Sequence, residues 1–534
     1  MSIDTRHKYP SGHMAASRPT TPAQRQLAAA FRRLKTLQDG GAVVFQSQDF
    51  APKQTAPLEK AGFLRRVIKG WYIASRPSNA AGDTTPWFAA MLDFVAGYSN
   101  ARFGERWHLS PVHSLLVQAG ATSLPRHIIV HAPDGANNSI DLPASSSLML
   151  YAAPSFPPPR ALTRIGASRV LTVPAALIAA PEHFFQRWPV EAQVALAQIR
   201  DASDLSRPLL EGGRSVVAGR LVGALRAVGR TAIADEVFET MRTAGYDVRE
   251  SNPFDVPLAV LHRSRLKSPH VLRMQLLWQQ MRDVVGRAMP ADPGLPPSPD
   301  AIDAYLADVE ATYATDAYHS LSIEGYRVTA ALIERVPRGD WSPLTDPHDA
   351  TAPDAWAALG YYRAFRAVTT ALGRIVDGES AASVVAADHG RWYRQLFGAS
   401  VDANVLAASD LAGYRNGPVC IENATHVPPP AEAVRDMMPA FFELLAAEPN
   451  AGVRAVLGHF FFVFIHPYMD GNGRMARLVM NAMLASGGFP WTVISHKHRA
   501  AYFAALDAAS ARSDIGPFAR FVAAAIDAPT PPAI

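Results

Sequence analysis

Residues 466–477 read HPYMDGNGRMAR and place together side chains that could carry out chemistry on a nucleotide. His466 is a candidate general base, because a neutral imidazole accepts a proton near pH 7. Asp470 is suited to holding a hard cation such as Mg²⁺. Arg474 and Arg477 are three residues apart, so both project from one face of a first helical turn. The spacing predicts a site that holds a nucleoside triphosphate and moves part of it onto a hydroxyl group.

The helices and turns around this run must hold the side chains of the run in position. Apolar residues at helical spacing over 453–464 predict a helix that ends near His466, because Pro467 biases that residue away from helix. Residues 471–473 (Gly-Asn-Gly) predict a tight turn that aims several backbone N–H groups into one small volume. The helix that follows should close at residues 487–488 (Gly-Gly). Its N-terminus favours a phosphate, and a bound anion would offset the cost of two arginines there.

This run resembles the motif of the Fic (filamentation induced by cAMP) family, HxFx[D/E]GNGRxxR, with Tyr468 in place of the usual Phe. The resemblance implies transfer of AMP from ATP, the substrate, to a Ser, Thr or Tyr hydroxyl of a target protein, with Mg²⁺ as cofactor. It also implies these roles: His466 as base, Asp470 as Mg²⁺ ligand, Gly471 to Gly473 as anion hole, Asn472 and Arg474 as phosphate contacts, and Arg477 as the residue that orients the γ-phosphate.

A second segment, SLSIEG at residues 320–325, resembles the family's inhibitory motif [S/T]xxxE[G/N]. Ser320 and Glu324 are four residues apart, so they share a helix face, and Gly325 is a plausible stop for that helix. The resemblance implies that Glu324 pairs with Arg477 and occupies the arginine that the γ-phosphate needs. An ordinary exposed glutamate before a turn is the alternative for this hexamer alone.

Residues 412–430, AGYRNGPVCIENATHVPPP, resemble the flap of the family, a β-hairpin beside the active site. Val419, Cys420 and Ile421 form a short β-prone run between turn formers. The resemblance implies that this strand pairs with the target segment and positions its hydroxyl with little side-chain selectivity. Cys420 is interpreted as an ordinary flap residue rather than a reactive thiol.

Positive charge is concentrated at the N-terminus. Residues 1–80 contain thirteen Lys and Arg against four Asp and Glu, a net charge of +9, whereas the whole chain has +4. A helix, two short helices near residues 47–62 and a hairpin turning at Gly70 predict a winged helix-turn-helix that binds DNA. The alternatives are a protein-contact domain and a solvated basic face. The candidate phosphate contacts are Lys53, Lys60, Arg65, Arg66 and Lys69.

The N-terminal region, and more loosely residues 81–250, resembles the AbiEi-type antitoxin and regulator family. The pattern LxxAGFLRRVIKGWYI carries most of this resemblance, and WHLSPVHSLLVQAG carries some of the rest. It implies a regulatory or antitoxin-like role for this half of the chain.

Pro-rich stretches and changes in composition along the sequence predict a multidomain protein. We expect a disordered tail at 1–20, a winged helix-turn-helix at 21–80, an α+β domain at 81–265, a helix and Pro-rich linker at 266–299, and a mostly α-helical Fic domain at 300–528. We expect no membrane-spanning segment, because every apolar run of about twenty residues is broken by charge. A single cysteine fits a cytoplasmic location.

Two functions from different classes fit these features. The first is an autoinhibited protein adenylyltransferase with a regulatory N-terminus, of which a fused toxin–antitoxin pair is a variant. The second is a DNA-binding regulator whose Fic unit mainly senses nucleotide. Resemblance to the Fic family also makes a homodimer an expectation. Neither the target protein nor the preferred nucleotide base can be read from the sequence.

Overall fold

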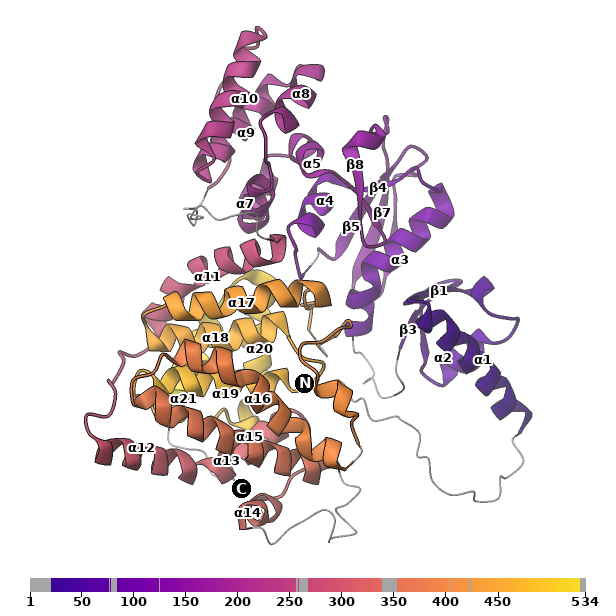
Figure 1. The fold of residues 1–534 in the computed structure, drawn as a ribbon. Helices are drawn as coiled ribbons and strands as arrows, with labels where there is room; N and C mark the ends of the chain where they lie inside the picture. Colours follow the sequence, from indigo (N-terminus) through magenta and orange to yellow (C-terminus); the bar gives the residue numbers. More distant parts are fainter. Residues whose placement is uncertain are drawn as a thin grey trace. The chain divides into compact units, whose positions relative to one another are not determined.

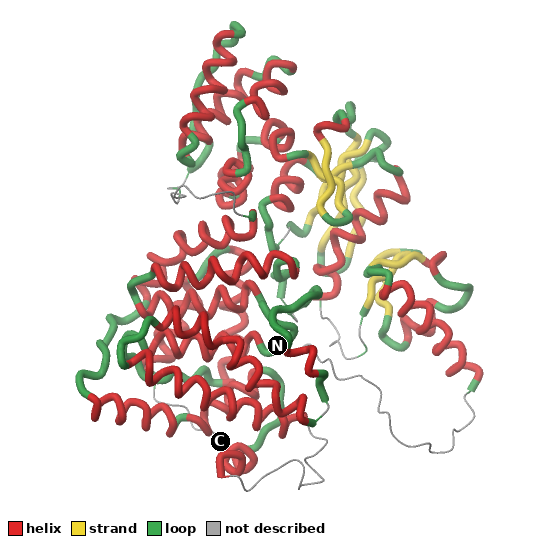
Figure 2. The backbone as a smooth tube through the Cα atoms, in the orientation of Figure 1, coloured by secondary structure: helices red, strands yellow, loops and turns green. Residues whose placement is uncertain are grey.

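The computed structural model describes residues 21–75, 77, 84–123, 125–255, 258, 268–338, 353–403, 405–421 and 424–528. The chain divides into two compact units. One contains the described parts of 270–421 and 428–534, and the other contains those of 9–269 and 422–427. Figure 2 shows that the strands lie in the N-terminal unit, whereas the C-terminal unit is built from helices. The candidate active site lies within the helical unit.

The helical unit is assembled around two neighbouring helices, α18 (Ala451–Ile465) and α19 (Asn472–Ala485). Every residue of α19 is buried, and so are nearly all residues of α18, so both helices are apolar around most of their circumference. The Asn450 side chain caps α18 by accepting a hydrogen bond from the Val453 N–H. The two helices pack along each other and hold the 466–471 loop between them.

The remaining helices surround this pair (Figure 1). Helix α15 packs along α16, and both contact α19. Their bounds are α11 Pro269–Ala288, α12 Pro299–Ala311, α13 Tyr313–Ile323, α14 Ala330–Arg338, α15 Pro353–Val376, α16 Ala381–Asp402, η3 Ala408–Leu411, α17 Ala431–Ala447, η4 His496–His498, α20 Arg499–Arg512 and α21 Gly516–Asp527.

The segment between α11 and α12 is fastened to the helical core. The Gly294 N–H donates to the Gly487 carbonyl over 2.9 Å, and the Ala451 N–H donates to the Asp292 carboxylate. Gly488 adopts a φ of +79°, and a Cβ there would lie 1.8 Å from the Gly294 carbonyl oxygen. The Pro-rich stretch expected to be a connector is therefore a bound strap over residues 289–298.

The expected flap hairpin is absent from the described part of 412–430, where no residue is assigned to a strand. Val419 is buried, and Cys420 and Ile421 are half-buried. Within its described residues, the segment has no neighbouring strand to bond its backbone. It contains tight turns and a Pro-rich end, and side chains bond its carbonyl groups, as described below. Residues 422 and 423, the middle of the predicted hairpin, lie outside the described residues.

The N-terminal unit begins with a small domain around its own core. Helix α1 (Pro22–Asp39) starts with a capping box at Thr21 and Gln24. Strands β1 (Val44–Gln46), β2 (Leu64–Ile68) and β3 (Trp71–Ala74) form an antiparallel sheet in the order β1-β3-β2. The short helices η1 (Ser47–Asp49) and α2 (Thr55–Lys60) lie between β1 and β2 in the chain. The β2–β3 turn contains Gly70 at a φ of +82°.

The rest of this unit combines small sheets with helices. One sheet has the order β4-β5-β7-β6, in which β5 and β7 are parallel, and β8 pairs with β9. In the described ranges, no helix is long and apolar enough to cross a membrane. The bounds are α3 Thr85–Phe103, β4 His108–Leu109, α4 Pro111–Gln118, β5 His127–Ala132, β6 Asn138–Leu142, β7 Ser146–Ala152, η2 Pro159–Ala161, β8 Leu162–Ile165, β9 Ser168–Leu171, α5 Val173–Ala179, α6 His183–Arg187, α7 Pro189–Ala197, α8 Ser203–Glu211, α9 Ser215–Ala227 and α10 Thr231–Thr243.

Candidate active site

His466 terminates α18 in a left-handed conformation, with φ 54° and ψ 60°. A non-glycine residue in this region costs about 1 kcal/mol or more, so surrounding contacts must hold it there. Its imidazole is buried, and Nδ1 lies 3.2 Å from the Val463 carbonyl oxygen. When Nδ1 donates to that carbonyl, Nε2 is the unprotonated nitrogen and can accept a proton. That tautomer is the one that the predicted role of His466 as a base requires.

The loop after His466 is held by Asn472 and by aromatic stacking. The Asn472 side chain accepts from the Tyr468 N–H and donates to the Tyr468 carbonyl, both over 2.9 Å. The Tyr468 ring stacks on Tyr393 with centroids 3.7 Å apart. The Asn472 amide thus closes the loop at Tyr468, and its contact with phosphate stays a prediction.

Gly471 and Asp470 form the entry to α19. Gly471 precedes the helix with a φ of +77°, and a Cβ there would lie 2.7 Å from the Phe397 ring. Asn472 and Gly473 are helical rather than part of a free turn. The Asp470 carboxylate accepts from the Gly471 N–H and lies 3.6 Å from Arg474 Nη2. The residues of the expected anion cradle therefore form the N-terminal turn of a buried helix, where unpaired N–H groups favour an anion.

Arg474 is buried between two aromatic rings. Its guanidinium carbon lies 5.1 Å from the centre of the Tyr326 ring and 4.9 Å from that of Phe397. Stacking covers the faces of the guanidinium and leaves its N–H edges for hydrogen bonds. In the part of the chain that the structure describes, Nε and Nη2 of Arg474 have no hydrogen-bond partner.

Arg477 is bound by the segment that resembles the inhibitory motif. Its Nη2 donates to the Glu324 carboxylate over 2.8 Å and to the Ser320 carbonyl over 3.0 Å. Its Nε donates to the Ser320 hydroxyl over 2.9 Å. Both charged side chains of the Arg477–Glu324 pair are only 3% exposed. The expected ion pair is present, with single rather than bidentate contact between the charged groups.

Glu324 also lies against Gly473, a residue of the expected anion cradle. A Cβ on Gly473 would be 2.5 Å from the Glu324 Oε1 atom, so the missing side chain at Gly473 makes room for this carboxylate. Burial alone would raise the pKa of Glu324, but nearby positive charges, among them Arg477 and Arg474, lower it below its ordinary value. Burial lowers the pKa of Arg477, and the Glu324 carboxylate more than restores it. The N-terminus of α19 therefore already holds one anionic group.

Two buried residues near Ser320, Asp316 and Tyr361, were not identified from the sequence. Asp316, one helical turn before Ser320, accepts a 2.6 Å hydrogen bond from the Tyr361 hydroxyl. Burial raises the pKa of Asp316 to about 6. The i, i+4 spacing of Asp316 and Ser320 places both on one face of α13, which ends at its C-cap Glu324, and could have identified Asp316. Tyr361 has no signal of this kind, because its contact depends on how α15 packs against α13.

The candidate phosphate contacts of the N-terminal domain lie on several elements and differ in exposure. Lys53, Lys60 and Lys69 are exposed. Arg66 pairs with Glu59 over 3.1 Å and lies over the Tyr72 ring. Arg65 is its neighbour on β2, so the two side chains point to opposite faces of the sheet. Contact of these residues with phosphates stays a prediction.

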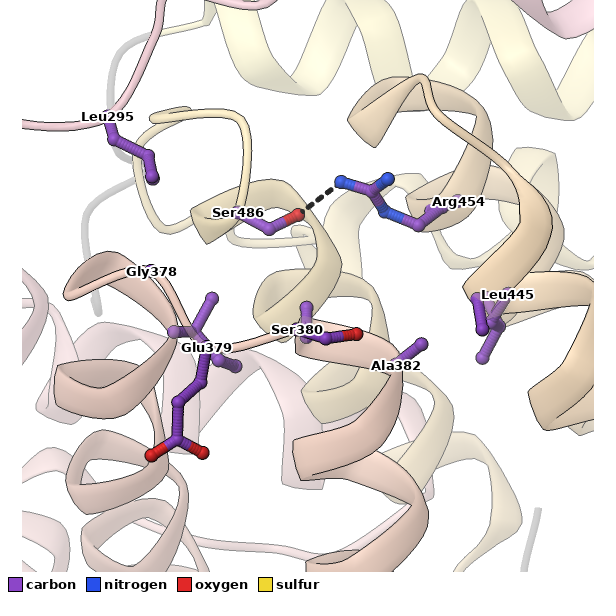
Figure 3. Close-up of a pocket in the computed structure, with 11 residues that line it drawn as sticks. Leu295, Gly378, Glu379, Ser380, Ala382, Leu445, Arg454 and Ser486 are labelled. Carbon is purple, nitrogen blue, oxygen red and sulfur yellow. Dashed lines mark hydrogen bonds between the residues drawn. The ribbon is translucent and has the colours of Figure 1, made fainter.

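A cavity of about 170 Å³ lies elsewhere in the helical unit (Figure 3). Arg454 directs Nη2 at the Ser486 hydroxyl on one side, at a distance of 2.8 Å. Glu379, at its edge, is already bound by Arg374. None of the motif residues lines this cavity, so it does not belong to the candidate active site. Its lining residues are Leu295, Ile375, Gly378, Glu379, Ser380, Ala381, Ala382, Leu445, Ala446, Arg454 and Ser486.

Known proteins resemble the helical unit. Residues 388–484 match the Fic/DOC family model. A protein adenylyltransferase Fic from Nematostella vectensis is 33% identical over 219 residues, which cover 40% of this chain and 47% of that protein. A protein of the same name from Drosophila willistoni is 38% identical over 102 residues, which cover 18% of this chain and 20% of that protein. The chain thus matches about half of the length of the first relative and about a fifth of the second.

Solved structures also align with this chain. Fic-1 from C. elegans is 19% identical, with a TM-score of 0.35, over 64% of this chain and 89% of that chain. A Fic domain containing signaling protein from Bacteroides thetaiotaomicron is 19% identical, with a TM-score of 0.32, over 47% of this chain and 93% of that chain. From the match to the family model and the named relatives, we conclude that residues 388–484, which include the HPYMDGNGRMAR run at the end of α18 and the start of α19, are a Fic domain.

Proposed function

We propose that this chain is an autoinhibited protein adenylyltransferase, which transfers AMP from Mg-ATP to a hydroxyl side chain of a target protein and of itself. The observation that carries the proposal is a set of buried cationic donors. Within the described residues, Nε and Nη2 of Arg474 and Nη1 of Arg477 lack hydrogen-bond partners. Leaving such donors unpaired in the interior is costly, and the oxygens of a polyphosphate would satisfy them.

The transfer step follows from the groups around α19. His466 Nε2 takes the proton of the attacking hydroxyl, the hydroxyl oxygen bonds to the α-phosphorus, and the bond to the β-phosphate oxygen breaks to release pyrophosphate. Arg474 and the N–H groups at the start of α19 neutralise charge on the phosphates. Asp470 is the residue that would hold Mg²⁺, which typically takes one or two carboxylates and substrate phosphates and screens their charge.

The proposed inhibition rests on competition for one arginine. Arg477 is bound by Glu324 and Ser320 in a setting that excludes water. A γ-phosphate that needs Arg477 must first displace a carboxylate that is already desolvated and paired. ATP then binds in a pose that leaves the α-phosphate poorly aligned with the attacking hydroxyl. A displacement of about 1 Å can lower the rate on the order of 100-fold, so the parent protein should transfer almost no AMP.

The test compares the position of the transferred label. Full-length parent, Glu324→Gly and Glu324→Gly/His466→Ala are incubated with Mg²⁺ and ATP labelled at either the α- or the γ-phosphate. Glu324→Gly should incorporate the α-label into protein, the parent very little, and the double variant none. Glu379→Gly is the matched control, because Glu379 is an exposed loop glutamate paired with Arg374. Incorporation of the γ-label instead would contradict AMP transfer, and equal labelling of parent and Glu324→Gly would contradict inhibition.

The alternative is a regulator in which the Fic domain binds nucleotide with negligible turnover. The same experiment separates it from the enzyme, because Glu324→Gly would then bind Mg-ATP without forming labelled protein. The oriented His466 favours the enzyme, since binding alone does not require a base beside the phosphate site. We place either activity in the cytoplasm, on the single cysteine of the chain.

We further propose that the N-terminal domain binds DNA as a winged helix-turn-helix. The order helix, strand, two short helices and hairpin, with the sheet arranged β1-β3-β2, supports this assignment. Lys60 at the end of α2 and Lys69 at the hairpin turn are exposed and available to phosphates. Arg66 contributes less, because Glu59 partly neutralises it.

Salt dependence tests the DNA proposal. Binding of the full chain to duplex DNA should weaken with salt, and Lys60→Gln/Lys69→Gln should lower the slope by about 0.9 for each phosphate that these lysines neutralise. Lys35→Gln, on exposed α1, is the matched control for removal of a surface charge. An unchanged slope, or no binding at low salt, would remove DNA binding while leaving the enzyme proposal intact.

A further inference from the structure

Arg415 is a buried arginine that binds main-chain carbonyl groups from three separate segments. It is 3% exposed. Its Nε donates to the His466 carbonyl over 2.7 Å, and Nη2 donates to the Ile465 carbonyl over 3.3 Å. The backbone N–H of Arg415 donates to the Pro467 carbonyl over 2.9 Å. The residue therefore contacts three consecutive carbonyls around the candidate base.

These contacts supply hydrogen-bond donors to carbonyl groups at the end of α18. The last carbonyl groups of a helix lack intrahelical partners, and the negative end of the helix dipole favours a cation. His466 has the additional cost of its left-handed conformation. By holding the carbonyls of Ile465, His466 and Pro467, Arg415 fixes the two peptide planes that determine where the imidazole points. The imidazole itself is then pinned by the Val463 carbonyl.

The same guanidinium holds both ends of the segment expected to receive the target. Nη1 donates to the Gly417 carbonyl over 3.1 Å, and Nη2 donates to the Pro429 carbonyl. These two residues bracket the stretch that contains Val419, which the resemblance to the flap assigns to target binding. Arg415 therefore joins residues on both sides of Val419 to the backbone at His466.

We propose that Arg415 is a positioning residue, which holds the backbone of the candidate base His466 in register with Gly417 and Pro429. The inference rests on the proposed adenylyl transfer. Arginine suits this role because its donors leave a rigid planar fork in several directions, whereas the ammonium of lysine donates from a single point. Burial lowers the pKa of Arg415 to about 10, so it stays charged at neutral pH and is not a proton carrier.

The test places Arg415→Lys in full-length Glu324→Gly protein and measures the rate of self-modification against ATP concentration. The maximal rate should fall roughly 10- to 100-fold, while the ATP concentration that gives half the maximal rate changes less than about two-fold. Arg454→Lys is the matched control: Arg454 also binds main-chain carbonyls, those of Glu448 and Pro449, but lies away from the motif. It should keep the maximal rate.

Hydrogen exchange provides a readout that does not require transfer. Arg415→Lys should speed exchange of the amides of Arg415, His466 and Tyr468 at least several-fold, while exchange across α19 and the unfolding temperature of the protein change little. A maximal rate equal to that of Arg454→Lys, an equal loss in apparent ATP affinity, or unchanged exchange at these three amides would overturn the inference. If Glu324→Gly transfers no AMP, the proposed function fails, and the exchange measurement still decides whether Arg415 holds His466 in place.

Discussion

Replacing Glu324 by glutamine should destabilise the helical unit and make its stability depend on nucleotide. The substitution keeps the size of the side chain and removes the negative charge that faces Arg477 at 2.8 Å, in a setting that is 3% exposed. Removal of one partner from a buried ion pair costs about 3–5 kcal/mol. We expect the lower end, about 3 kcal/mol, because Arg477 keeps its bonds to Ser320.

That loss translates into a measurable change in unfolding temperature. For a unit of this size, 1 kcal/mol corresponds to roughly 2–4 °C, so the transition should fall by roughly 6–12 °C. Mg-ATP at about 100 times its dissociation constant adds about 2.7 kcal/mol, which nearly offsets the loss. The parent should gain less from the same ATP, because the nucleotide must first displace Glu324.

The assay is calorimetric unfolding of full-length proteins with and without Mg-ATP. Both proteins also contain His466→Ala, so that modification does not alter them during the scan. Glu379→Gln is the control: that carboxylate is 54% exposed, and loss of a surface pair costs less than about 1 kcal/mol. The reasoning is refuted if Glu324→Gln unfolds at the temperature of the parent, or if ATP raises both transitions equally.

Three further changes test other parts of the helical unit. Because the pKa of Asp316 is raised from 3.8 to about 6, the stability that it contributes is complete below its unfolded pKa and is lost as the pH rises through 6. Asp316→Asn should therefore gain up to about 3 kcal/mol on the parent between pH 4 and pH 7 in urea unfolding, and a pH-independent difference would contradict this. Arg282→Ala removes both hydrogen bonds from α11 to the buried carboxylate of Glu448 and should cost about 2 kcal/mol by the same measurement, whereas an unchanged midpoint would show that the pair contributes nothing. Gly488→Ala should displace the strap at Gly294 and expose residues 289–298 to proteolysis, and continued protection there would contradict the contact.

The sequence predicted the features that depend on local pattern. The apolar run before His466 predicts α18, and the alternation of turn formers predicts the β2–β3 hairpin at Gly70. The i, i+4 spacing of Ser320 and Glu324 predicts a shared helix face, and both do contact Arg477. In each case the side chains that matter lie within a few residues of one another in the chain.

What the sequence did not predict depends on contacts between distant segments. Arg415 reaches carbonyls about 50 residues away, and carbonyl groups are present at every residue, so no pattern marks its partners. The expected flap strand was inferred from β-prone residues such as Val419, and strand propensity over three residues is easily overridden by tertiary contacts.

The strap over residues 289–298 has a consequence for the inhibition that we propose. Its bonds at Asp292 and Gly294 anchor the chain just before α12, and α13 follows α12 with Thr312 as the junction. Glu324 is thus an intramolecular ligand of Arg477 on a short tether, and its effective concentration is set by geometry rather than by the amount of protein. Dilution alone cannot lower that concentration within one chain. Under the proposed inhibition, activation would come from a change that moves α13 relative to α19, or from a ligand that binds Arg477 more strongly than a tethered carboxylate does.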